Sequence, residues 1–183
     1  ESINKTLRPA VDESVDFEKT KNVFIEGDNF EVLKLLRESY LNSIKMIYID
    51  PPYNTGKDFV YKDNFASPID NYLEQTGQKD NEGNKLQTNK ETNGRYHSDW
   101  LSMMYSRLKL AWNLLNENGV IFVSIDDNEA DHLLLMMNEI FGEENRIAIV
   151  TIQHNPKGRN QAKFFSENSD FMLVYSKDIT QSE

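Results

Sequence analysis

Cysteine is absent from the 183 residues, which excludes disulfide bridges and thiolate metal sites. That absence agrees with a reducing compartment, and we expect a cytoplasmic protein. Long apolar runs are absent too: none reaches the length of a membrane span, and residues 1–20 lack the hydrophobic region of a signal peptide. The sequence therefore predicts no membrane partner, and stability has to come from an ordinary hydrophobic core.

The sequence has few positively charged residues: it contains 20 Lys and Arg residues and 30 Asp and Glu residues, which gives a formal net charge of -10. Binding to a nucleic-acid backbone depends on Lys and Arg neutralising phosphates. The composition by itself therefore argues against nucleic acid as a partner. An acidic catalytic domain can still act on DNA when another segment supplies the basic surface, so the motifs have to decide.

The apolar residues alternate between strand and helix patterns. Short β-type runs predict strands at residues 23–25, 44–49, 120–125, 146–153 and 171–175. Helical spacing predicts helices after an N-cap at Asp28, from Ser98 to a stop at Gly119, and from a cap at Asn128 to Phe141. This order predicts an α/β fold with a mostly parallel sheet and, since no helix separates the last two strands, a terminal antiparallel hairpin.

The polar segments divide the chain. Residues 1–22 are polar and predict an N-terminal arm, and residues 23–183 predict one domain. That domain is interrupted by a long polar loop at about residues 54–97, which offers almost nothing to bury. Loops of this length are usually functional or disordered.

A tetrapeptide, Asp50-Pro51-Pro52-Tyr53, directly follows the strand expected at residues 44–49. In open α/β sheets, ligands bind beyond the carboxyl ends of the strands. The prolines fix the chain direction and have no N–H, so the segment offers a carboxylate, bare carbonyls and an aromatic ring. A plain turn is the alternative, since X-Pro-Pro sequences often form turns. The position after a buried strand favours a site.

This set of groups suits methylation of an exocyclic amino group. The amino group of adenine is a poor nucleophile because its lone pair is delocalised into the ring. Two acceptors, the Asp50 carboxylate and the Pro51 carbonyl, would favour a pyramidal nitrogen with its lone pair pointing outward, while Tyr53 stacks on the base. A sulfonium methyl placed in line then needs only positioning and electrostatics. The base has to leave the duplex to reach such a pocket.

Residues 49–56, Ile-Asp-Pro-Pro-Tyr-Asn-Thr-Gly, resemble the catalytic motif of amino-methyltransferases in the form used by adenine-N6 enzymes. Residues 25–29, 97–101, 107–111 and 123–129 extend the match. As an ordered set they resemble the methylation (Mod) subunit of type III restriction–modification systems, from Val23 to Lys177. The resemblance implies a Rossmann-like S-adenosylmethionine-dependent methyltransferase fold of the permuted beta class, incomplete in this chain.

The resemblance also implies partners and roles. It implies S-adenosylmethionine as cofactor, double-stranded DNA as substrate, a restriction (helicase/nuclease) subunit as partner and a homodimer of the full-length protein. Asp50, Pro51, Pro52 and Tyr53 are then catalytic. Asp28 then accepts a hydrogen bond from the adenine of the cofactor, which is compatible with its capping a helix.

A basic and aromatic loop separates the last two expected strands. Lys157 and Arg159 lie there near Phe164 and Phe165, a mixture suited to phosphate contacts and base stacking. A solvated loop with one Phe tucked into the core is the alternative. The resemblance places an aromatic residue near here against the flipped base, and we expect Phe165 rather than Phe164 in that role.

Other features set limits on the resemblance. The family's Phe-x-Gly-x-Gly cofactor loop has no counterpart among the eight scattered glycines, and the first residue is Glu1. We therefore expect part of a longer protein that is inactive by itself. Two alternatives stay open: a non-catalytic truncated subunit acting only in assembly, and methylation of an RNA base or a protein amide. Those last enzymes more often carry Asn in place of Asp50.

No metal is expected. Asp126 and Asp127 are explained better by helix capping than by a metal pair. His97, His132 and His154 lack the spacing of metal ligands, so we interpret them as structural.

Overall fold

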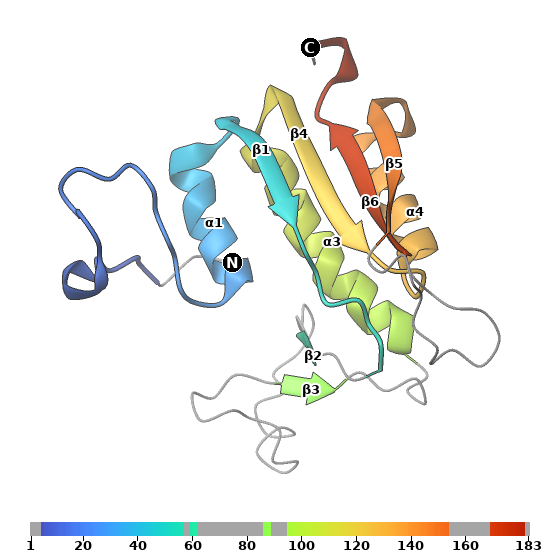
Figure 1. The fold of residues 1–183 in the computed structure, drawn as a ribbon, viewed down its shortest axis with the longest axis horizontal. Helices are drawn as coiled ribbons and strands as arrows, with labels where there is room; N and C mark the ends of the chain where they lie inside the picture. Colours follow the sequence, from blue (N-terminus) through green and yellow to red (C-terminus); the bar gives the residue numbers. More distant parts are fainter. Residues whose placement is uncertain (1–4, 57–58, 62–85, 89–94, 154–168, 182–183) are drawn as a thin grey trace.

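The computed structural model describes residues 5–56, 59–61, 86–88, 95–153 and 169–181 (Figure 1). Its longer helices and strands follow in chain order: α1 (Asn29–Tyr40), β1 (Ile44–Ile49), β2 (Phe59–Tyr61), β3 (Leu86–Thr88), α3 (Tyr96–Leu114), β4 (Leu115–Ile125), α4 (Ala130–Phe141), β5 (Arg146–Gln153) and β6 (Ser169–Ser176). Three short 3-10 turns, Val11–Glu13, Glu143–Asn145 and Ile179–Gln181, complete the described secondary structure.

The main sheet has four strands in the order β1-β4-β6-β5. β1 runs parallel to β4, whereas β6 runs antiparallel to both β4 and β5. The α/β fold and the terminal hairpin are confirmed, but the sheet is mixed rather than mostly parallel. Because β1 and β4 are parallel, their carboxyl ends meet at one edge, with Ile49 beside Val123. Asp50 therefore emerges beside the last residues of β4.

The first expected strand, residues 23–25, is wrong. Val23 and Phe24 are 74% and 91% exposed, and no described strand pairs with them. An apolar run becomes a strand only where a neighbour accepts its backbone hydrogen bonds. As a result β1 is an edge strand of the described sheet, with Met46 and Tyr48 exposed on the face away from the helices. Its apolar sequence had predicted burial on both faces.

The helix boundaries differ at two places. α3 begins at Tyr96 and ends at Leu114, so Gly119 is not its stop and lies inside β4. A Cβ at Gly119 would lie 2.9 Å from the Asn116 carbonyl and 3.0 Å from the Ile44 carbonyl, so glycine permits the close approach of β4 to β1. α4 begins after Glu129, because the Asn128 amide donates instead to Asp126 Oδ2 at 2.7 Å.

The expected polar loop contains a small element. β2 and β3 pair antiparallel, a pairing that the composition of this loop did not predict. The rest of residues 54–97 is described only at its two ends, up to Gly56 and from Arg95.

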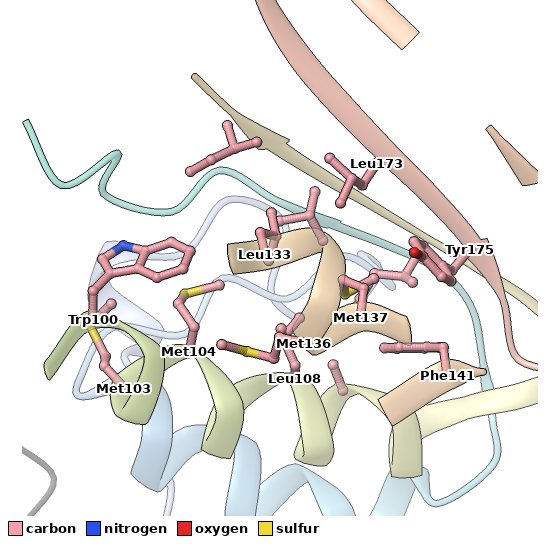
Figure 2. Close-up of a cluster of buried hydrophobic side chains, with 14 of the residues drawn as sticks. Trp100, Met103, Met104, Leu108, Leu133, Met136, Met137, Phe141, Leu173 and Tyr175 are labelled. Atoms are coloured by element: carbon pink, nitrogen blue, oxygen red, sulfur yellow. The ribbon is translucent and has the colours of Figure 1, made fainter. Parts of the chain in front are cut away.

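Helices α3 and α4 cover one face of the sheet and form the core with it. Figure 2 shows Trp100, Met104 and Leu108 of α3 facing Leu133 and Met137 of α4, under strand β6. α1 packs against α3. The Asp28 carboxylate accepts a hydrogen bond from the Glu31 N–H at 3.0 Å, which confirms its role as N-cap. No helix in the described part of the chain is long and apolar enough to cross a membrane.

Candidate active site at the carboxyl ends of β1 and β4

Asp50 lies exposed directly after the last residue of β1. The hydroxyl of Ser124, a buried residue of β4, donates a hydrogen bond to Asp50 Oδ1 at 2.7 Å. The Tyr48 hydroxyl lies 3.4 Å from the same Ser124 oxygen. The parallel register of β1 and β4 therefore orients the carboxylate, and Ser124 is a site residue that the sequence had not singled out.

Tyr53 completes this end of the site. Its ring packs against the edge of the core. Burial raises the pKa of the Tyr53 hydroxyl to about 12; a hydrogen bond with Ser124 opposes that rise, and the charges of Asp50 and Asp170 add to it. The phenol therefore stays neutral, so it can contribute a ring face and a polar O–H but not a base.

The turn after Asp50 is held from beneath by the first turns of α3. The Trp100 indole N–H donates to the Pro52 carbonyl at 2.7 Å, and the Tyr96 hydroxyl donates to the Asn54 carbonyl. Of the two bare proline carbonyls expected from the sequence, that of Pro52 is thus occupied. No described residue donates to the carbonyl of Pro51, a residue that is buried as a whole.

Asn54 ends the turn in a left-handed conformation, with φ at 60° and its side chain fully buried. Asparagine is one of the few residues that adopt this conformation readily. Its side-chain amide donates to the carboxylate of Glu129, which is the residue before α4. The turn is thereby attached to α4 as well as to α3.

Acidic groups gather at this edge of the sheet. Burial raises the pKa of Asp126; hydrogen bonds from Asn128 lower it, and the neighbouring charges of Asp127 and Asp170 raise it. Asp126 makes hydrogen bonds only to Asn128 among the described residues. It closes a local turn and does not cap α4.

Asp28 is the N-cap of α1. In Figure 1 that helix runs antiparallel to β1, so its start lies toward the end at which β1 finishes. One of the Asp28 carboxylate oxygens caps the helix, and no described residue donates to the other. The neighbouring Asn29 accepts a hydrogen bond from Arg107 at 2.7 Å, which fixes α1 to α3. Phe165, Lys157 and Arg159 lie outside the described residues, as does His154.

Two histidines converge on Glu129, which their positions in the sequence did not indicate. His97 Nδ1 lies 2.7 Å and His132 Nδ1 lies 2.8 Å from the Glu129 carboxylate. One ligand atom from each of the three residues falls within 4.8 Å of the others, so they are the described group with the composition of a cation site. A hollow of about 730 Å³ between α3 and α4 is lined by His132, Leu101, Tyr105 and Met136 among others, and none of the catalytic or binding residues expected from the sequence lines it.

The chain is similar to known DNA methylases. A model of the N6_N4_Mtase family, described as DNA methylase, matches residues 44–181. The chain is 42% identical over 160 residues to the Mod subunit of the type III restriction-modification enzyme EcoPI of Escherichia phage P1, covering 87% of this chain and 25% of that protein. It is 44% identical over 158 residues to the StyLTI Mod subunit of Salmonella typhimurium, covering 85% and 24%. The chain thus spans about a quarter of the length of these curated relatives.

Among solved structures, the fold resembles that of PvuII DNA methyltransferase (cytosine-N4-specific). The TM-score is 0.51 at 16% identity, and the match covers 85% of this chain and 48% of that one. At this identity the likeness concerns the fold alone. It agrees with the α/β arrangement of β1, α3 and β4.

Proposed function

The chain belongs to the N6/N4 DNA methylase family, and on that premise we propose that the intact protein methylates the exocyclic N6 of adenine in double-stranded DNA. One observation carries the proposal. The Asp50 carboxylate is oriented by Ser124, and the next residue in the chain, Pro51, has a carbonyl to which no described residue donates. Two acceptors on consecutive residues directly after a parallel strand suit the two N–H bonds of an amino group.

The chemistry follows from these acceptors. Ser124 occupies Asp50 Oδ1 and leaves Oδ2 to accept one N–H of the substrate amine, while the Pro51 carbonyl accepts the other. Both bonds strengthen as positive charge develops on the nitrogen, which is the condition for lowering the barrier. The neutral Tyr53 supplies a ring against which the base can lie. No nucleophilic side chain is needed, because the substrate nitrogen attacks the methyl group directly; the N–H proton that the product loses can pass to the Asp50 carboxylate or to solvent.

S-adenosylmethionine supplies the electrophilic methyl group when bound. Of the residues in this chain, Asp28 fits a contact with the cofactor, because one carboxylate oxygen is engaged in capping α1 and the other is open. The remaining contacts, above all a glycine-rich loop, have no counterpart in this chain. Asp28 is therefore one part of a cofactor site that the rest of the intact protein has to complete.

The relatives support a role as the modification subunit of a type III restriction–modification system, in the cytoplasm. In that role the protein forms a homodimer and associates with a restriction subunit of the helicase/nuclease kind. Lys157, Arg159 and Phe165 are the proposed DNA contacts, with the phenylalanine against the flipped base. The two basic residues are too few to reverse the repulsion that the net charge of -10 exerts on DNA.

Replacing Asp50 by Asn in the intact protein tests the proposal. We expect the turnover number to fall by about 10²-fold or more, as for other groups that stabilise developing charge. The loss should be near 10²-fold rather than near 10³-fold, because Asp50 is exposed to solvent in the free protein. Calorimetry should give an unchanged affinity for S-adenosylmethionine.

Asp131→Asn is the matched control, because Asp131 is exposed in the first turn of α4 and makes no hydrogen bond or ion pair with the described residues of the site. Its turnover should equal that of the wild type. Near-normal turnover in Asp50→Asn would contradict the proposed role.

A further inference from the structure

Glu129 is a fully buried carboxylate without a Lys or Arg partner among the described residues. Buried carboxylates are costly unless hydrogen bonds or opposite charges satisfy them. Here three donors converge on the two oxygens: the Asn54 amide and His97 Nδ1 on Oε1, and His132 Nδ1 on Oε2. Both oxygens of the carboxylate therefore have hydrogen-bond partners.

The three donors come from three different segments. Asn54 ends the turn that begins at Asp50, His97 is the second residue of α3, and His132 lies in the first turn of α4. In the proposed active site only the turn carries reacting groups. The carboxylate thus connects the turn to the two helices whose other ends are fixed in the core.

Hydrogen bonds from two sides reach the described part of the turn. α3 supplies Trp100 to the Pro52 carbonyl and Tyr96 to the Asn54 carbonyl, both from one helix. Among the described residues, α4 reaches the turn by a hydrogen bond only through Glu129. Asn54 also has to be held at a positive φ, which an L-residue adopts at some cost.

We propose that Glu129 is a positioning residue for methyl transfer: its buried carboxylate clamps Asn54, and through it the Pro51 carbonyl and Asp50, against His97 and His132. This inference rests on the proposed function of Asp50 and Pro51 as acceptors. Each histidine has to carry a proton on Nδ1 to donate to the carboxylate, and both histidine side chains are partly exposed. Glu129 itself does not touch the substrate.

The test uses Glu129→Gln and Asn54→Gly in the intact protein. Glutamine keeps the shape of Glu129 but removes its charge and one acceptor oxygen. Glycine at position 54 removes the side chain and tolerates the positive φ, so the backbone of the turn is not strained. Each variant should lower the turnover number by about 10²-fold, the scale of a displacement of about 1 Å, while the DNA KM and the cofactor affinity stay within about threefold.

The double variant separates positioning from general stability. If Glu129 acts through Asn54, the loss in the double variant should be well below the product of the two single losses, because the Asn54–Glu129 contact is common to both. Asn54→Gly also removes the hydrogen bond from the Asn54 amide to the Tyr96 carbonyl at 3.4 Å, so the two single losses need not be equal. Multiplication of the two losses would contradict the proposal. Glu139→Gln is the matched control, since Glu139 lies on α4, the helix that follows Glu129, is exposed and, among the described residues, accepts a hydrogen bond only from the Tyr105 hydroxyl. It should leave turnover unchanged.

A second readout does not depend on activity. In Glu129→Gln and in Asn54→Gly, amide hydrogen exchange should accelerate in the peptide covering residues 53–56, with exchange in β4 and β6 unchanged. Should the wild type prove not to methylate DNA, the proposed function fails while this readout still decides the clamp. Acceleration of exchange spread evenly over the chain, or no acceleration in the turn, would overturn the proposed clamp.

A metal analysis gives one more decisive outcome. Stoichiometric Zn²⁺ retained by the purified protein and lost in His132→Asn would also overturn the proposed clamp, because it would assign the three side chains to a metal.

Discussion

Trp100 packs in the core and also donates a hydrogen bond to the turn of the active site. Its replacement by Phe should therefore lower the free energy of unfolding by more than the replacement of a tryptophan at the surface. The side chain is fully buried, and its indole N–H donates to the Pro52 carbonyl at 2.7 Å. Phenylalanine leaves that carbonyl without its donor, which costs about 1–3 kcal/mol, at the lower end because Pro52 is half-buried. The smaller ring leaves a void that adds about 1 kcal/mol, well below the roughly 3–5 kcal/mol of a change to Ala.

The sum predicts a loss of about 2–3 kcal/mol in the free energy of unfolding. Urea unfolding followed by far-ultraviolet circular dichroism measures it. Trp112→Phe is the matched control: Trp112 is 36% exposed, and its recorded partner is the Lys177 ammonium, 4.5 Å above the ring. That change should cost about 0.5–1 kcal/mol. Equal losses in the two variants, or a loss under about 0.5 kcal/mol for Trp100→Phe, would refute this reasoning.

Two further predictions concern the same end of the sheet. The pKa of Tyr53 is raised by burial from 10.0 to about 12, so its contribution to folding is complete below pH 10 and is lost as the pH rises through 12. Tyr53→Phe should therefore lose less stability than the wild type over that range in unfolding titrations, and parallel curves would contradict the assignment. Residues 1–183 alone should bind S-adenosylmethionine weakly or not at all, because the chain contains no glycine-rich cofactor loop; micromolar affinity by calorimetry would show that the loop is dispensable.

The periodicity of the sequence was enough to predict β1, β5 and the approximate extent of β4, β6 and the helices. Ile44–Ile49 and Arg146–Gln153 form strands over the expected residues. These runs are rich in β-branched residues and are bounded by turn residues, so local preference and tertiary pairing agree. Asp28 likewise caps α1, because an N-cap is decided within one turn of helix.

Features that depend on distant neighbours were not predictable. Residues 23–25 have a strand-like composition but no described partner, and Gly119 looked like a helix stop although it permits close approach of two strands. In both cases the deciding contact lies elsewhere in the chain. The spacing of apolar residues, every two residues in a strand or every 3.6 in a helix, indicates which face of the element is apolar. It does not indicate which other element packs against that face.

The site shows the same division. The position of Asp50 beyond a strand was predictable from the motif and the order of elements. Ser124, Trp100 and Glu129 were not, because each reaches the turn across more than forty residues of chain. Ser124 and Glu129 stand in the segment 123–129 and Trp100 in the segment 97–101, both of which carried the family resemblance. That was the available signal, but it gave no role to any of the three.

Mass analysis of nucleosides from DNA methylated by the intact protein tests the central claim most directly. The motif at residues 49–56, in the form that resembles adenine-N6 enzymes, predicts N6-methyladenine in the digest, formed only when S-adenosylmethionine is supplied and reduced by about 10²-fold or more in Asp50→Asn. Finding N4-methylcytosine as the only product would contradict the assignment of the base, and finding no methylated nucleoside with fully folded, cofactor-loaded protein would contradict the proposed function itself.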